Sequence, residues 1–135
     1  MNEPIVKVND LTKRFGGLMA VGGLSFEMAP GEILGLIGPN GAGKTTVFNC
    51  LTGFLPIDEG NVYLDGRAIT GYQPYQICQL GMARTFQIVK PFLTISVLDN
   101  VMVGGLAKER STARAKEAAM EIIEFVGLGK MASQE

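Results

Sequence analysis

One eight-residue stretch constrains the fold of this 135-residue chain more than any other feature. Residues 38–45 read GPNGAGKT, which fits the spacing G-x-x-x-x-G-K-[ST]. The mostly apolar residues 32–37 before it predict a strand buried on both faces. A helix is predicted over residues 44–52, with Gly53 at its C-terminal stop. The chain is therefore expected to place a glycine-rich turn between a strand and a helix, in an α/β fold.

This turn has the P-loop pattern, and its residue types suit a polyphosphate. Glycines let successive main-chain N–H groups converge on one anion, and the start of a helix adds unpaired N–H groups and a partial positive charge. Lys44 is predicted to reach the β- and γ-phosphates, Thr45 to offer its hydroxyl to Mg²⁺, and Thr46 to donate to the α-phosphate. The expected phosphate-binding residues are Gly38, Asn40, Gly41, Ala42, Gly43, Lys44, Thr45 and Thr46.

The rest of the chain alternates between predicted strands and helices. Short apolar runs bounded by turn residues predict strands at residues 5–8, 24–28 and 61–64. Asp65-Gly66 predicts a hairpin turn. Further helices are predicted at residues 74–80, 96–103 and 112–126. Since one buried strand cannot form a parallel sheet, we expect the chain to be a truncated piece of a longer domain.

The sequence also predicts how one of these helices begins and which face of another is buried. Ser96 and Asp99 are close to a capping box at the start of the second of these helices. In the third, an apolar face is expected to consist of Ala115, Ala118, Ala119, Ile122 and Val126.

Composition excludes several classes of function. With 12 Lys and Arg against 13 Asp and Glu, the net charge is −1, which argues against a nucleic-acid-binding protein. The chain contains no histidine, so no Ser-His-Asp triad and no imidazole metal site exists within it. The two cysteines have neither zinc-site nor disulfide-framework spacing, and a reducing compartment is expected.

The residues around the P-loop resemble the ATP-binding cassette (ABC) ATPases. Residues 38–46, GPNGAGKTT, look like the Walker A motif of that family. Residues 11–17, LTKRFGG, continuing through Ala20 and Val21, resemble the segment that presents its adenine-stacking aromatic residue. The resemblance implies that Phe15 stacks on adenine, where Tyr is more usual, and that Val21 belongs to the same nucleotide-binding segment.

Residues 84–87, RTFQ, resemble the Q-loop of the same family. The resemblance implies that Gln87 contacts Mg²⁺ and the attacking water, and that it links the site to a membrane subunit. An amide suits this role because its oxygen can ligate a metal while the group also forms hydrogen bonds. The implied catalytic residues are Lys44 and Gln87, the implied metal ligands are Thr45 and Gln87, and the implied cofactors are ATP and Mg²⁺.

The resemblance is closer to one subfamily, the ATP-binding subunits of branched-chain amino acid importers. It rests on RFGGL at residues 14–18, TTVFNCLTGF at residues 45–54 and the RTFQ stretch. It implies an ABC-type P-loop NTPase core with an N-terminal antiparallel β part over about residues 1–87, followed by the start of a helical subdomain over about 88–135. A surface for coupling to the membrane subunits is implied near residues 89–100.

The resemblance also implies partners and a location. They are transmembrane permease subunits, a second ATP-binding subunit in a homo- or heterodimer and, indirectly, a substrate-binding protein, with no nucleic acid. The chain is then expected to lie peripherally on the cytoplasmic side of the inner membrane.

The signature LSGGQ, the Walker B carboxylates and the switch histidine of the family do not occur in these 135 residues. The chain alone is therefore expected to bind nucleotide at best, without turnover. Alternatives are an ATP-binding subunit for urea or other amides, a DNA-maintenance ABC ATPase, a switch GTPase or nucleotide kinase, and a fragment without activity. A GTPase would be expected to show D-x-x-G and N-K-x-D, and neither pattern occurs.

Overall fold

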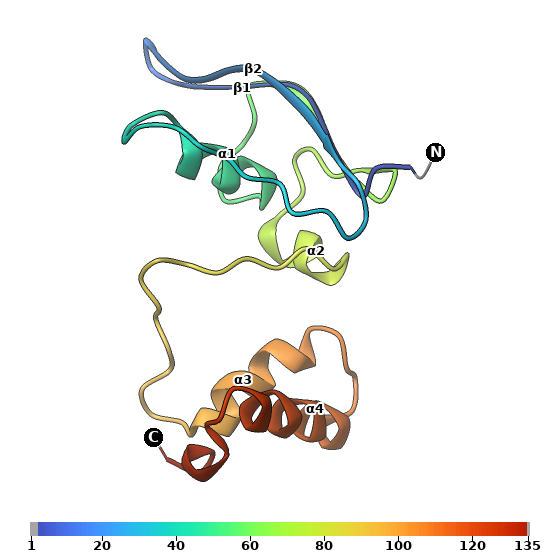
Figure 1. Cartoon of the computed structure of the whole chain (residues 1–135), viewed down its shortest axis with the longest axis vertical. Coiled ribbons are helices and arrows are strands. Elements are labelled where there is room, and N and C mark those ends of the chain that lie inside the picture. The colour runs from blue at the N-terminus through green and yellow to red at the C-terminus, as the bar shows by residue number, and fades with distance from the viewer. Residues whose placement is uncertain (1–2, 135) are drawn as a thin grey trace. The chain divides into compact units, whose positions relative to one another are not determined.

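The computed structural model describes residues 3–134, which form two compact units that divide between Arg84 and Thr85 (Figure 1). The first unit contains β1 (Val6–Phe15), β2 (Leu18–Met28), α1 (Lys44–Leu51), β3 (Glu59–Leu64), β4 (Arg67–Ala68) and α2 (Pro74–Gln79). The second contains α3 (Val97–Leu106), α4 (Thr112–Phe125) and the 3₁₀ turn η1 (Gly129–Met131). No helix within residues 3–134 is long and apolar enough to cross a membrane.

The first unit is built on an antiparallel sheet with the strand order β2-β1-β3-β4. Side chains alternate across β1, so that Val6 and Val8 are buried while Lys7 and Asn9 lie on the other face. The predicted hairpin turn is confirmed, because Asp65 joins β3 to β4 with a φ of 48° and Gly66 follows with 71°.

The core of this unit lies between one face of the sheet and the helices α1 and α2. The strands contribute Val6, Val8, Leu11, Val21, Val62 and Leu64, and the rest of the unit contributes Val47, Cys50, Leu51, Ile69 and Ile77. The predicted α1 is confirmed over Lys44–Leu51, and Gly53 follows it with a φ of 76°. Burial of these side chains therefore holds the helix that begins at the glycine-rich turn against the sheet.

The predicted buried strand at residues 32–37 is wrong for the chain as the structure describes it. This segment, which leads from the end of β2 toward α1 in Figure 1, forms no strand. Ile33 is 98% exposed and Ile37 is 94% exposed. A strand buried on both faces needs neighbours for its main-chain groups and its side chains, and no strand within residues 3–134 pairs with it.

The first two strands are longer than the sequence pattern indicated. β1 runs on to Phe15 and β2 starts at Leu18, whereas only residues 5–8 and 24–28 were expected. Register shifts interrupt the β1–β2 pairing at several points beyond Val8. Each bulge breaks the period of two in the side chains, so the pattern did not reveal these strand ends.

The second unit is a pair of packed helices, α3 and α4. The Ser96 cap is confirmed, since its hydroxyl oxygen accepts from the Asp99 N–H at 3.1 Å and its hydroxyl donates to the Asp99 carboxylate at 2.6 Å. The apolar face predicted for α4 is partly wrong. The buried residues are Ala115, Ala119 and Ile123, whereas Ile122 and Val126 are exposed.

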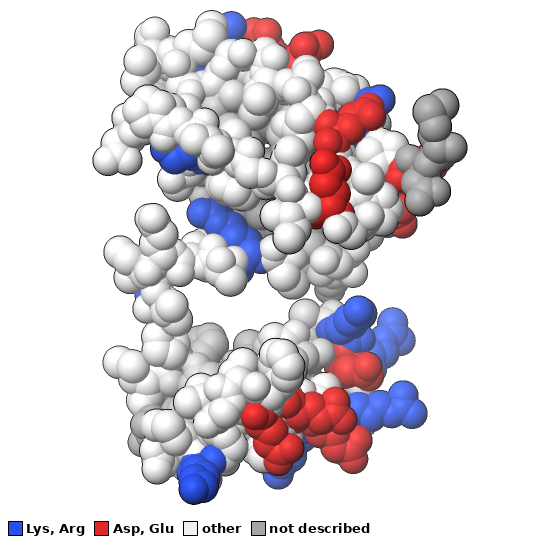
Figure 2. Space-filling model, in the orientation of Figure 1, with Lys and Arg blue, Asp and Glu red and all other residues white. Residues whose placement is uncertain are grey.

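A close approach between the two helices explains why the buried face of α4 differs from the predicted one. A Cβ added at Gly105 of α3 would lie 3.6 Å from Cβ of Ala115, so the contact is centred on two small residues. Spacings of four from Ala115 then lead to the buried positions. The opposite face is acidic, and Figure 2 shows acidic side chains gathered over α4, where Glu117, Glu121 and Glu124 are exposed.

An ion pair ties the end of β1 to the segment before β3. The Lys13 ammonium donates to one carboxylate oxygen of Asp58 at 2.9 Å, and the other oxygen accepts from the Arg14 N–H at 2.6 Å. The Asp58 N–H donates to the Thr12 carbonyl at 3.0 Å. The bonds from the Arg14 N–H and the Lys13 ammonium favour the charged carboxylate and lower the pKa of Asp58 below its ordinary value of 3.8, the Arg14 N–H contributing most.

We expect Leu11→Ala to lower the free energy of unfolding by about 2–5 kcal/mol, because Leu11 is fully buried and the substitution leaves a cavity. Leu18→Ala is the matched control, since Leu18 is 69% exposed. Urea unfolding followed by circular dichroism measures both variants. Equal losses would contradict the core described above.

We also expect a pH-dependent difference between the wild type and Asp58→Asn. Because the pKa of Asp58 is lowered by folding, its carboxylate stabilises the fold above the ordinary pKa, and this contribution disappears as the pH falls through the folded-state value. Unfolding measured from about pH 7 down to about pH 3 should show the wild-type advantage shrinking below about pH 5. An advantage that stays constant over that range would refute the role of the charge.

Candidate functional site

The glycine-rich turn at residues 38–43 bends tightly into the first turn of α1. Gly41 and Gly43 both have a φ of 83°, a left-handed conformation that glycine adopts without strain. The Ala42 N–H donates to the Pro39 carbonyl at 3.2 Å within the turn. The two glycines therefore set the path of the backbone into α1.

The Lys44 side chain forms hydrogen bonds with the backbone of the turn. Its ammonium donates to the carbonyl of Gly38 at 2.6 Å and to that of Pro39 at 2.7 Å. An ammonium has three donors, so one remains for a further acceptor after these two bonds. The side chain is half-buried, so its charge can also be reached from solvent.

The N-terminus of α1 is open to an anion. Among the described residues, no side chain caps this end, and the first turn contains no acidic residue. Thr45 is exposed and Thr46 is half-buried. Asn40 and Ala42 are exposed on the turn itself. Uncapped N–H groups, a partial positive charge and the Lys44 ammonium thus share one short segment, as an anion site requires.

A close contact with β2 fixes the position of this turn. A Cβ added at Gly43 would lie 2.3 Å from the carbonyl oxygen of Ala20 and 3.3 Å from a methyl group of Val21. Ala20 is the extra residue of a bulge, because Lys13 pairs with Val21 and Arg14 pairs with Met19. Only glycine fits there. No local pattern in the sequence indicates that Ala20 lies against Gly43, so this contact was not predicted.

Phe15 and Val21 have different surroundings. Phe15 ends β1 and is 47% exposed, with the Lys13 ammonium 5.6 Å from its ring centroid. Val21 is buried in the core beside Gly43. Phe15 therefore offers a partly exposed aromatic surface, whereas Val21 packs in the core beside the turn. Their roles toward a nucleotide stay predictions.

Gln87 belongs to the second unit, where it is exposed in a segment without helix or strand. Its role toward the nucleotide and Mg²⁺ stays a prediction. The start of the RTFQ stretch is fixed to the first unit. The Arg84 guanidinium donates to the side-chain oxygen of Asn49 at 2.6 Å and lies 5.7 Å from the ring centroid of Phe54.

A magnesium ion at this site would depend mainly on its nucleotide. Within residues 3–134, no group of three or more acidic residues or cysteines could hold a metal ion. The exposed Thr45 hydroxyl at the start of α1 fits an ion that takes few protein ligands and several from phosphates and water.

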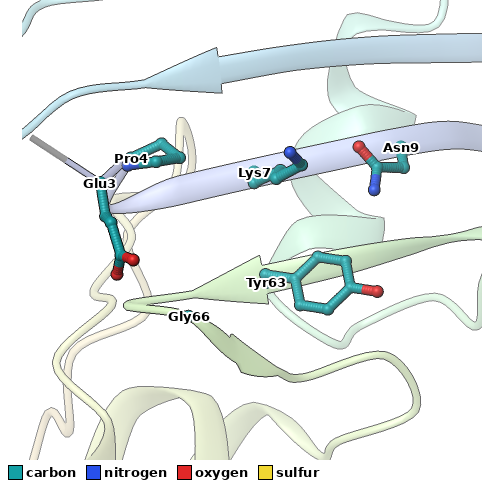
Figure 3. A pocket seen from close by; sticks show the side chains of 6 residues that line it. All are labelled: Glu3, Pro4, Lys7, Asn9, Tyr63 and Gly66. Atoms are coloured by element: carbon teal, nitrogen blue, oxygen red, sulfur yellow. The ribbon is translucent and has the colours of Figure 1, made fainter. Parts of the chain in front are cut away.

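A separate hollow of about 340 Å³ lies on the sheet face opposite α1 (Figure 3). Its lining consists of Glu3, Pro4, Lys7, Asn9, Tyr63 and Gly66. The Lys7 ammonium is paired with Glu27 at 2.6 Å, and this pairing raises the pKa of Lys7. No residue of the P-loop lines this hollow.

The chain is similar to ATP-binding proteins of branched-chain amino acid transport. The ATP-binding protein LivG of high-affinity branched-chain amino acid transport from Escherichia coli (strain K12) is 41% identical, over 100% of this chain and 59% of LivG. The corresponding BraF of Pseudomonas aeruginosa is 40% identical, over 99% of this chain and 58% of BraF. The chain therefore spans about three fifths of the length of these relatives.

Similar solved structures share the fold. An ATP-binding cassette of an ABC transporter, solved in its ADP conformation, superposes with a TM-score of 0.83 at 32% identity, covering 98% of this chain and 57% of that protein. The ABC transporter family model matches residues 21–135, which include the P-loop, Arg84 and both helices of the second unit. Because this match covers most of the chain and includes the P-loop, the chain belongs to the ABC transporter family.

Proposed function

We propose that the protein containing this chain is the ATP-binding subunit of a membrane importer, and that it couples ATP binding and hydrolysis to the uptake of branched-chain amino acids. The observation that carries the proposal is the glycine-rich turn, in which the Lys44 ammonium binds two turn carbonyls beside an uncapped helix N-terminus. The substrate is suggested by the relatives, LivG and BraF, whose names specify branched-chain amino acid transport.

The phosphates of ATP would lie against the N–H groups of residues 41–46, with Lys44 beside the β- and γ-phosphates. Charge complementarity supports this orientation, because a triphosphate meets an ammonium, a helix N-terminus and no nearby acidic side chain in the first turn. The adenine would stack on the exposed part of Phe15, which needs only an aromatic face.

The reaction proposed for the whole protein is ATP plus water giving ADP plus phosphate. Mg²⁺, when bound, neutralises charge on the phosphates, and Thr45 and Gln87 would be its ligands from this chain. Lys44 would hold the transferred phosphoryl group in place through its charge. Gln87 would position the attacking water through its amide. Phosphoryl transfer depends largely on such positioning, so these residues would act by orientation and charge.

The partners proposed are transmembrane permease subunits, a second ATP-binding subunit and, indirectly, a substrate-binding protein. A surface for the permease is supported by apolar side chains exposed before α3, namely Ile88, Val89, Phe92 and Leu93. Asn100 fixes part of this segment, because its side chain accepts from the Phe92 N–H at 2.8 Å and donates to the Phe92 carbonyl at 3.0 Å. The protein would then lie peripherally on the cytoplasmic side of the inner membrane.

Removal of the Lys44 charge tests the proposal directly. We expect Lys44→Ala to raise the Kd for Mg-ATP about 10- to 100-fold, because a charged hydrogen bond to phosphate is lost. Lys116→Ala is the control, since Lys116 is exposed on α4. Isothermal titration calorimetry of the full-length protein measures both. Equal affinities of wild type and Lys44→Ala would refute the proposal.

The two glycines of the turn that have a positive φ give a second, matched test. Gly41 and Gly43 share a φ of 83°, but only at Gly43 would a Cβ meet the Ala20 carbonyl. Gly43→Ala must displace the turn, so we expect its Kd for Mg-ATP to exceed that of Gly41→Ala by roughly ten-fold or more, about 1.4 kcal/mol. If both substitutions weaken binding equally, the contact with β2 does not position the phosphate site.

A further inference from the structure

Lys13 and Phe15 share a face of β1, two residues apart. The Lys13 ammonium lies over the Phe15 ring, 5.6 Å from its centroid. Lys13 is only 6% exposed, whereas Phe15 is 47% exposed. A buried ammonium therefore covers part of an aromatic ring that otherwise remains open to solvent.

Asp58 fixes the position of this ammonium. Its carboxylate binds Lys13 through one oxygen and the Arg14 N–H through the other, and its own N–H binds the Thr12 carbonyl. Three consecutive residues at the end of β1 are thereby joined to one side chain and its backbone. The next residue in β1 is Phe15. The bonds to Asp58 therefore fix the end of the strand that carries the Phe15 ring.

We propose that Lys13 and Asp58 are positioning residues for the base of the bound nucleotide. They fix the Phe15 ring by a cation–π contact on one side and leave its exposed part for the base. This inference rests on the proposed function, in which Phe15 stacks on adenine. The ion pair then strengthens binding of the base and contributes little to binding of the phosphates.

Two probes separate these contributions, Mg-ATP and magnesium tripolyphosphate, which has no base. We expect Lys13→Met in the full-length protein to raise the Kd for Mg-ATP roughly 3- to 10-fold, while the Kd for tripolyphosphate changes less than about two-fold. Lys13→Arg keeps the charge and should restore wild-type affinity. Lys7→Met is the matched control, because Lys7 forms the other β1 lysine pair, with Glu27, and should change neither affinity.

The link to the ring is tested in the Phe15→Ala background. There we expect Lys13→Met to change the Kd for Mg-ATP less than about 1.5-fold, because the ring through which it acts is gone. Asp58→Asn is measured in parallel, since its amide oxygen still accepts from the Arg14 N–H. It should show the same loss, confined to Mg-ATP, and it replaces Lys13→Met if that variant does not fold.

Two results would overturn the inference: equal weakening of both probes by Lys13→Met or Asp58→Asn, or an undiminished effect without Phe15. Lys44→Ala separates this failure from failure of the proposed function. If Lys44→Ala weakens both probes while Lys13→Met and Asp58→Asn weaken neither, only the positioning role is wrong. If Lys44→Ala leaves both affinities unchanged, the phosphate site itself is wrong.

Discussion

The backbone of Gly43 lies against the carbonyl of Ala20, with no room for a side chain between them. This contact fixes the glycine-rich turn on the bulge of β2 and so on the sheet. α1 begins one residue later, and its buried side chains lock it to the same sheet. The direction of the helix N-terminus, and of the N–H groups it leaves unpaired, therefore follows from one backbone contact and the core beneath it.

Two lysines of the first unit serve opposite electrostatic purposes. Lys13 is buried and neutralised by Asp58, so its charge is confined to the end of β1. Lys44 is half-buried, and within residues 3–134 its ammonium is bound to two neutral carbonyls and to no carboxylate, so its charge remains available to a ligand. An anion that approaches the start of α1 thus meets an uncompensated positive charge. We therefore expect phosphate to bind beside Lys44 and not beside Lys13.

Local chemistry was predictable from the sequence, and contacts between distant residues were not. The extent of α1, the Asp65-Gly66 hairpin and the Ser96 cap depend on neighbouring residues, and each was confirmed. The strand expected at residues 32–37 was wrong, because a strand forms only beside a partner. Lys13 and Asp58 are 45 positions apart, and no pattern indicates their pairing. The P-loop was recognisable as a motif, but the contact of Gly43 with the Ala20 carbonyl was not predictable.

We expect the N–H groups and the ammonium around residues 41–46 to hold the phosphates of ATP. A crystal structure of the full-length protein with Mg²⁺ and a non-hydrolysable ATP analogue tests it most directly. We expect phosphate oxygens within hydrogen-bonding distance of these N–H groups and of the Lys44 ammonium. Density for the analogue elsewhere, such as the hollow lined by Lys7 and Tyr63, with an empty P-loop, would contradict it.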